Sequence, residues 1–291
     1  MNKLISKSRI IAGTMSWGSW GKNLNENEIA DLIAKFCQAG ITAFDHADIY
    51  GGYTTELEFG KAFKKLSVNR SNVEFITKCG IMYPCNKNNF EVKHYDYSAK
   101  NIRKSIENSL NNLNTEYIDI FLLHRPSPLM QVEEIGDIIS KLKEEKKIIS
   151  FGVSNFSENQ INLLEKTTNI DWNQIELSIT NNSPFTNGLI DYLNQKNIGI
   201  MAWSPLGDFF KTKSKSNMAL LKLLEVLNKK YSSTNDQLLL SWLMKHPSKI
   251  FPVIGTTNYE RISLAASSEN IELEITDWFL MYEKINGKRV P

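Results

Sequence analysis

Residues 118–153 read IDIFLLHRPSPLMQVEEIGDIISKLKEEKKIISFGV, and this segment alternates between two apolar patterns. Ile118–Leu123 and Ile148–Val153 are short, nearly continuous apolar runs, which are typical of strands buried on both faces. Between them, apolar residues recur at helical spacing, at Val132, Ile135, Ile138, Ile139 and Leu142. A strand, a helix and a second strand in this order predict parallel strands joined by a helix.

The same alternation extends along the whole chain. The predicted strands are Ile10–Thr14, Ile41–Asp45, Val73–Lys78, Ile118–Leu123, Ile148–Val153, Trp172–Leu177, Ile198–Trp203 and Ile250–Ile254. One further helix is predicted after Asn25 and another after Ser157. Others are predicted at Glu56–Leu66, at Ala99–Leu113 and around Leu189, and two more lie between Asn217 and Lys245. Asn25 with Glu28, and Ser157 with Gln160, have the spacing of capping boxes.

About eight β/α units in 291 residues favour a (β/α)8 TIM barrel over a doubly wound open sheet. No Pro/Gly/Ser-rich linker interrupts the pattern, so we expect residues 1–291 to form a single domain. Because a chain of this length can bury a large core, it needs no disulfide or metal to fold.

Composition excludes several classes of function. The charges nearly balance, with 34 Lys and Arg against 32 Asp and Glu, which argues against a nucleic-acid or anionic-membrane partner. No apolar run approaches the roughly 20 residues of a membrane span, and residues 1–11 lack the apolar core of a signal peptide. Cys37, Cys79 and Cys85 form no Cys-x-x-Cys pair, so we expect neither disulfides nor a metal site. We predict a soluble, cytoplasmic protein that is a monomer or a weak oligomer.

In such a barrel, side chains just past the carboxyl ends of the strands converge on one mouth. Four titratable residues lie at the ends of three successive predicted strands. Asp45 ends the second strand and is followed by Tyr50, Lys78 ends the third, and His124 lies at the end of the fourth. An acid, a base and a cation in one pocket shift one another's pKa values far from the ordinary ones. These four residues are therefore the candidate catalytic group.

Their chemistry suits the reduction of a carbonyl. The ordinary pKa of tyrosine is about 10, and a neighbouring Lys78 ammonium is expected to lower it for Tyr50. Asp45 would keep that ammonium charged, and His124 would hold a substrate oxygen. Reduction requires a hydride at carbon and a proton at oxygen, and since no side chain stores a hydride, a cofactor must supply it.

Several motifs along the chain resemble those of the aldo-keto reductases. They are Phe44–Gly51 (FDHADIYG), Phe75–Lys78 (FITK), Leu122–Pro126 (LLHRP), Gly152–Phe156 (GVSNF), Asn173–Glu176 (NQIE), Trp203–Gly207 (WSPLG) and Ile254–Arg261 (IGTTNYER). The resemblance extends from Gly13 to Arg261 in the order of the family, and it is greatest to a bacterial subgroup of general oxidoreductases.

The resemblance implies roles for individual residues. Asp45, Tyr50, Lys78 and His124 become the catalytic tetrad, with Tyr50 as the general acid. The implied cofactor-binding residues are Gly13, Thr14, Met15, Asp45, Ser154, Asn155, Gln174, Trp203, Ser204, Pro205, Leu206, Gly207, Gly255, Thr256, Thr257 and Arg261. Among these, Ser154, Asn155 and Gln174 would hold a nicotinamide carboxamide, and Trp203 would stack on the ring. Ser204–Gly207 would run beside the pyrophosphate.

One departure from the family pattern affects the choice of cofactor. Gly255 stands where many members place a lysine for the adenosine 2′-phosphate, so a preference for NADP(H) over NAD(H) depends mainly on Arg261, near Thr256 and Thr257. Trp17, Trp20 and Tyr83 lie in loops after the first and third strands. We expect them to line an apolar substrate pocket, with ordinary loop packing as the alternative.

Three other functions compete with this interpretation. Tyr192-x-x-x-Lys196 has the spacing of short-chain dehydrogenases, but the glycines near the N-terminus lack the required spacing. A metal hydrolase using His46, Asp48 and His124 would lack a His-x-His pair. A regulatory or sensor subunit that binds a nicotinamide cofactor with little turnover would retain the tetrad. We predict an NADP(H)-dependent oxidoreductase that reduces aldehydes or ketones, small carbonyl molecules, to alcohols.

Overall fold

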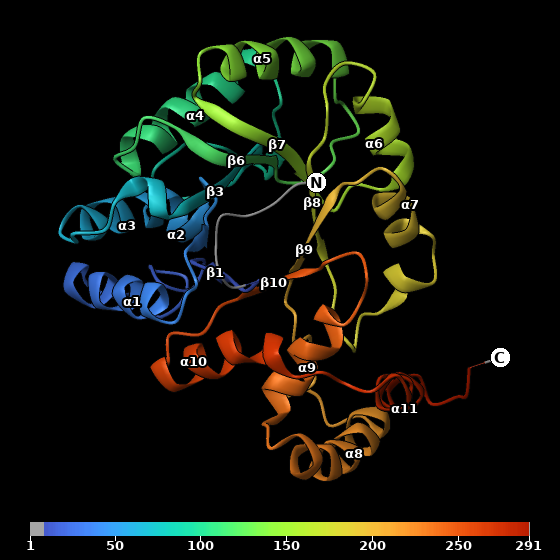
Figure 1. The fold of residues 1–291 in the computed structure, drawn as a ribbon. Coiled ribbons are helices and arrows are strands. Elements are labelled where there is room, and N and C mark those ends of the chain that lie inside the picture. The colour runs from blue at the N-terminus through green and yellow to red at the C-terminus, as the bar shows by residue number, and fades with distance from the viewer. Residues whose placement is uncertain (1–8, 291) are drawn as a thin grey trace.

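The computed structural model describes residues 9–290, and within them eight parallel strands close into a barrel (Figure 1). The strands are β1 (Ile11–Gly13), β2 (Ala43–Asp45), β3 (Glu74–Cys79), β6 (Ile118–Leu123), β7 (Ile148–Ser154), β8 (Trp172–Glu176), β9 (Gly199–Trp203) and β10 (Phe251–Ile254). Around the barrel they follow the order β1-β10-β9-β8-β7-β6-β3-β2. The predicted (β/α)8 fold is confirmed.

Helices surround the barrel on its outside (Figure 1). They are α1 (Glu26–Gln38), α2 (Tyr50–Tyr53), α3 (Thr55–Lys64), α4 (Ala99–Asn112), α5 (Val132–Glu144), α6 (Glu158–Leu164), α7 (Leu189–Gln195), α8 (Lys215–Tyr231), α9 (Asn235–Met244), α10 (Tyr259–Ser267) and α11 (Ile275–Asn286). Short 3₁₀ turns form at η1 (Arg70–Asn72), η2 (Ser183–Phe185) and η3 (Ser268–Asn270). The capping boxes predicted at Asn25 and Ser157 are present, at the starts of α1 and α6.

The core has two layers. Inside the barrel lie Ile11, Ala43, Ile76, Ile120, Leu122, Trp172, Met201 and Val253. Two glycines make room for Trp172, since a Cβ at Gly152 or Gly199 would come within 3.0 Å of atoms of that residue. A larger apolar layer fills the space between the strands and the helices. The barrel is therefore filled by side chains, and open space is found beyond the strand ends.

Trp17 belongs to this outer layer. Its indole is fully buried and stacks on Phe36 with ring centroids 5.8 Å apart, and Phe44 and Phe59 pack against it as well. The prediction that Trp17 lines the substrate pocket is wrong, because three phenylalanines from α1, β2 and α3 enclose it in the core.

The sequence pattern missed several elements. A short antiparallel hairpin of β4 (Ile81–Met82) and β5 (His94–Tyr95) follows β3, and its two-residue strands are too short to show a periodicity. The helices α10 and α11 were also missed. Within the part of the chain that the structure describes, no helix has both the length and the apolar character to cross a membrane.

Candidate active site

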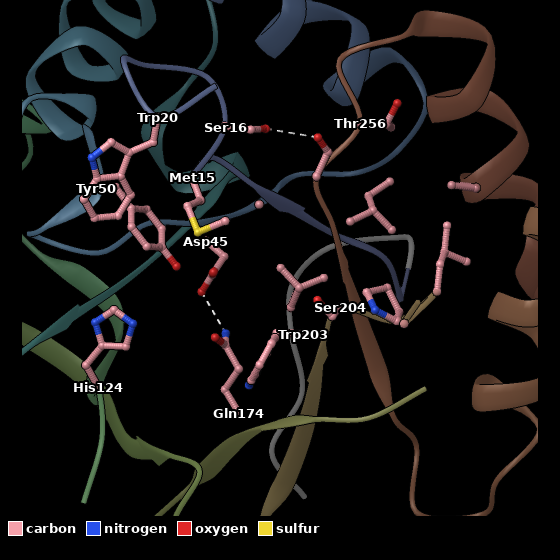
Figure 2. A pocket seen from close by; sticks show the side chains of 18 of the residues that line it. Met15, Ser16, Trp20, Asp45, Tyr50, His124, Gln174, Trp203, Ser204 and Thr256 are labelled. Carbon is pink, nitrogen blue, oxygen red and sulfur yellow. Dashed lines mark hydrogen bonds between the residues drawn. The ribbon is translucent and has the colours of Figure 1, made fainter. Parts of the chain in front are cut away.

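The carboxyl ends of the strands surround a cavity of about 860 Å³ (Figure 2). Asp45, Tyr50 and His124 line one end of it, together with Trp20 and Tyr83. The other end is lined from the segments that follow β9 and β10, by Ser204, Pro205, Leu206, Gly207, Gly255, Thr256 and Arg261. The cavity therefore has polar, titratable side chains in one part and residues of two loops in another.

Lys78 lies beneath the polar end of the cavity and is 1% exposed. Its Nζ donates to both carboxylate oxygens of Asp45, each at 2.8 Å, and to the carbonyl oxygen of His46 at 2.7 Å. It also lies 3.2 Å from the hydroxyl of Tyr50. Burial alone would lower the pKa of Lys78, but Asp45 and Tyr50 outweigh it, and the pKa lies above its ordinary value. The ammonium therefore stays charged.

Tyr50 begins α2 and is 8% exposed. Gly51 and Gly52 follow it with φ angles of 61° and 66°, which glycine adopts without strain and which turn the chain sharply after Tyr50. Burial raises the pKa of Tyr50, Lys78 lowers it, and the net direction is upward. The ammonium thus acts in the direction that the sequence predicts, but the expectation of a lowered pKa is wrong because burial outweighs it. Tyr50 is a protonated phenol at neutral pH.

His124 follows β6 and faces Tyr50, with the two ring centroids 6.1 Å apart. Burial, and after it the charge of Lys78, holds the pKa of His124 well below its ordinary value, so the imidazole is neutral at neutral pH. Its Nδ1 is buried and has no hydrogen-bond partner among the described residues. A buried, unprotonated Nδ1 without a partner costs less free energy than a buried N–H without a partner. We therefore assign the proton of the neutral ring to Nε2.

Gln174 and Trp203 form the middle of the cavity (Figure 2). The amide nitrogen of Gln174 donates to Asp45 Oδ1 at 2.8 Å, and the indole N–H of Trp203 donates to Asn155 Oδ1 at 3.1 Å. Ser154 and Asn155 are not among the side chains that line the cavity. The hydroxyl of Ser154 donates to the carbonyl oxygen of Gln174 at 3.0 Å. Ser154 and Asn155 therefore contact the lining residues Gln174 and Trp203 and help to hold them in position.

Two further predicted cofactor contacts lie away from the cavity. Thr257 is not among the lining residues. Thr14 is fully buried, and its hydroxyl donates to the carbonyl oxygen of Asp45 at 3.0 Å. Because that donation uses its only proton, the contact of 2.9 Å between Thr14 and His46 requires His46 Nδ1 to donate. Gly13 and Met15, on either side of Thr14, do line the cavity.

Some lining residues were missed by the sequence analysis. Ile49, Ile81 and Phe210 add apolar surface, while Lys93, Arg125 and Lys211 add positive charge. Arg125 directly follows His124 in the quoted segment, so its position at a strand end was a usable signal. Lys93 lies in the segment between β4 and β5, and nothing in the sequence placed that segment over the mouth.

His46 is fully buried beside this site, and its Nε2 has no partner among the described residues. Burial lowers its pKa from 6.5 to about 3. The folded protein therefore holds His46 neutral, whereas the unfolded chain takes up a proton as the pH falls below 6.5. We expect the free energy of unfolding to fall by about 2–3 kcal/mol between pH 6.5 and about 4.5 from this residue, with His124 adding in the same direction.

Urea unfolding of the wild type and of His46→Asn at several pH values measures this effect. The variant should lose stability less steeply over the same pH range. Identical slopes for the two proteins would show that other groups cause the acid sensitivity.

Comparison with known proteins adds to this geometry. The family model described as "Aldo/keto reductase family" matches residues 9–286. The chain is 38% identical to a 6-dehydroglucose reductase of Agrobacterium fabrum, over 97% of this chain and 96% of the relative. It is 36% identical to the uncharacterized oxidoreductase YcsN of Bacillus subtilis, covering 98% and 96%. An aldo-keto reductase of Klebsiella pneumoniae in complex with NADPH superimposes with a TM-score of 0.79 at 20% identity, over 97% of this chain and 92% of that one.

Proposed function

Because the chain belongs to the aldo/keto reductase family, we propose that it is an NADP(H)-dependent oxidoreductase that reduces an aldehyde or ketone to an alcohol, with Tyr50 as the general acid. One observation carries the proposal. A charged Lys78, held by Asp45, lies 3.2 Å from the hydroxyl of a protonated Tyr50 at the end of a large cavity. The ring of a neutral His124 lies next to the ring of Tyr50, with 6.1 Å between the two centroids.

The lining of the cavity fits a nicotinamide dinucleotide. Trp203 offers an aromatic face, and Gln174 offers an amide next to it. Arg261 and Lys211 supply positive charge in the groove at the other end, where an anionic phosphate would need it. The similar Klebsiella pneumoniae structure holds NADPH, which supports the assignment. When bound, this cofactor supplies the hydride that the carbonyl carbon receives.

The protein's own residues then handle the proton. Tyr50 donates its phenolic proton to the carbonyl oxygen, and the ammonium of Lys78 stabilises the phenolate that remains. Asp45 fixes the ammonium in place. The Nε2–H of His124 donates a hydrogen bond to the same carbonyl oxygen and so orients the substrate.

A panel of carbonyl compounds assayed with NADPH and with NADH tests the proposal. The panel includes a sugar aldehyde, because a relative is named for reducing 6-dehydroglucose. We expect aldehyde-dependent oxidation of NADPH. Tight binding of NADPH without turnover on any aldehyde would instead support the regulatory or sensor function.

The choice between the cofactors gives a further prediction, which concerns Arg261. This residue lies near the N-terminus of α10 and lines the groove. Its guanidinium can donate hydrogen bonds to two oxygens of a 2′-phosphate. Among the described residues, a Cβ at Gly255 would meet only Ser16 Oγ, at 4.0 Å, so the space directly beside this glycine is open. We expect NADPH to bind about 10- to 100-fold more tightly than NADH, and Arg261→Ala to remove most of this difference.

Titrations of both cofactors, followed by tryptophan fluorescence, measure the effect. Lys65→Ala is the control, because Lys65 is a cation that does not line the cavity and pairs with Glu26 at the surface. NADH affinity should change little in Arg261→Ala. An equal loss for both cofactors would assign Arg261 a structural role, and a wild-type preference for NADH would overturn the NADP(H) assignment.

A further inference from the structure

The guanidinium of Arg125 is fixed beside the catalytic residues. Its Nη1 donates to the carbonyl oxygen of His124 at 2.9 Å and to Ser154 Oγ at 3.0 Å. Its central carbon lies 5.5 Å from the ring centroid of Trp203. Within residues 9–290, Nε and Nη2 make no hydrogen bond, and the side chain lines the cavity. Arg125 is therefore held in one orientation with part of its donor fork unused.

Lys93 brings a second positive charge to this end of the cavity from a different segment, the loop between β4 and β5. Arg125 and Lys93 both lower the pKa of His124, which shows that both charges act on the catalytic end. The acidic residues that line the cavity are Asp45 and Asp236. Asp45 is already bound by Lys78, and among the described residues neither Asp45 nor Asp236 forms an ion pair with Arg125 or Lys93.

Apolar side chains line the same cavity as these two cations. Trp20 lies with its ring centroid 5.1 Å from that of Tyr83 and 6.2 Å from that of Tyr50. Ile49 and Ile81 complete the apolar wall. A substrate that fits this end therefore meets both apolar side chains and positively charged ones.

We propose that Arg125, assisted by Lys93, selects aldehydes whose other carbons carry hydroxyl or carboxylate oxygens and disfavours alkyl aldehydes. The inference rests on the proposed reductase function and specifies its substrate class. The unused N–H groups of Arg125 donate to an oxygen of the substrate near the reacting carbonyl. The ammonium of Lys93 adds charge for a substituent that extends further toward the mouth.

Matched aldehydes test the proposal. Glyceraldehyde is compared with propanal, and succinic semialdehyde with butanal, in wild type, Arg125→Met, Arg125→Lys and Lys93→Met. For Arg125→Met we expect kcat/KM to fall about 10- to 100-fold on the two oxygen-rich aldehydes, mainly through KM, with a much smaller fall on propanal and butanal. Arg125→Lys keeps the charge but loses the planar fork. If the carboxylate is the preferred group, Arg125→Lys should therefore recover more of the kcat/KM on succinic semialdehyde than on glyceraldehyde. If hydroxyls are the preferred group, it should recover the kcat/KM on neither aldehyde.

Lys87→Met is the matched control, since Lys87 lies in the same loop and its Nζ donates to the carbonyl oxygen of Tyr53 at 3.1 Å, away from this cavity. It should leave all four aldehydes unchanged. An equal loss on all four in Arg125→Met, with weaker NADPH binding, would show that Arg125 only supports Ser154 and Trp203, and would overturn the inference. If wild type reduces none of the aldehydes, the proposed reductase function itself fails.

Discussion

Replacing Tyr50 with Phe is expected to slow carbonyl reduction by at least ~100-fold while the protein folds and binds its cofactor as before. The hydroxyl combines a transferable proton with a neighbouring cation, at 3.2 Å from Lys78 Nζ. Phe keeps the aromatic ring and its contacts with Trp20 and His124, so the loss isolates the proton.

Because the pKa of Tyr50 lies above its ordinary value, the wild-type rate of reduction should stay level through neutral pH and fall only in alkaline solution, where the phenol loses its proton. Steady-state kinetics with NADPH measures both effects. Tyr192→Phe is the matched control, since its hydroxyl donates to Asn162 Oδ1 at 2.9 Å on the outside of the barrel. Near-wild-type turnover in Tyr50→Phe, or a large loss in Tyr192→Phe, would contradict the assignment of the acid.

The barrel could be predicted from the sequence because its strands and helices are marked by patterns among residues close together in the chain. Each strand is a short apolar run, and the helix starts at Asn25 and Ser157 are marked by residues three positions apart. The hairpin of β4 and β5 could not be predicted, since two residues per strand carry no period and its pairing of Ile81 with Tyr95 is not local. That hairpin brings Lys93 to the cavity, so the part of the fold that was missed bears on specificity.

The residues of the candidate site could be predicted where the end of a strand determines the position of a side chain. Asp45, Tyr50, Lys78 and His124 come together because parallel strands end at the same edge of the barrel. Trp17 and Trp20 show the limit. They are three residues apart, yet one is enclosed by phenylalanines and the other lines the cavity, and only the packing distinguishes them.

The direction of the Tyr50 pKa shift shows a second limit. Two effects act on Tyr50, burial raising its pKa and Lys78 lowering it, and their balance depends on how completely the ring is buried. Residue order predicts that the ammonium is near. It does not give the exposed fraction, and that fraction decides the sign.

Replacing Lys78 with Met is expected to damage both stability and catalysis. Asp45 is 3% exposed, and its carboxylate would keep one side-chain donor, Gln174, in place of two. Removing one partner of a buried ion pair costs about 3–5 kcal/mol of folding free energy, because the other charge is left uncompensated. Turnover should fall over the whole neutral range, since the ammonium nearest to the phenolate of Tyr50 is then missing.

Adding Asp45→Asn to Lys78→Met should cost far less than the sum of the two single changes, because the amide removes the unpaired charge that the first change creates. Urea unfolding and kcat/KM for wild type, both single variants and the double variant measure this coupling. Lys65→Met and Glu26→Gln, which break an exposed ion pair of 2.7 Å, form the control cycle, and their coupling should stay below about 1 kcal/mol. If the Asp45 and Lys78 losses are additive in both measurements, the two residues act independently. Asp45 would then have a role in the site other than holding the ammonium beside Tyr50.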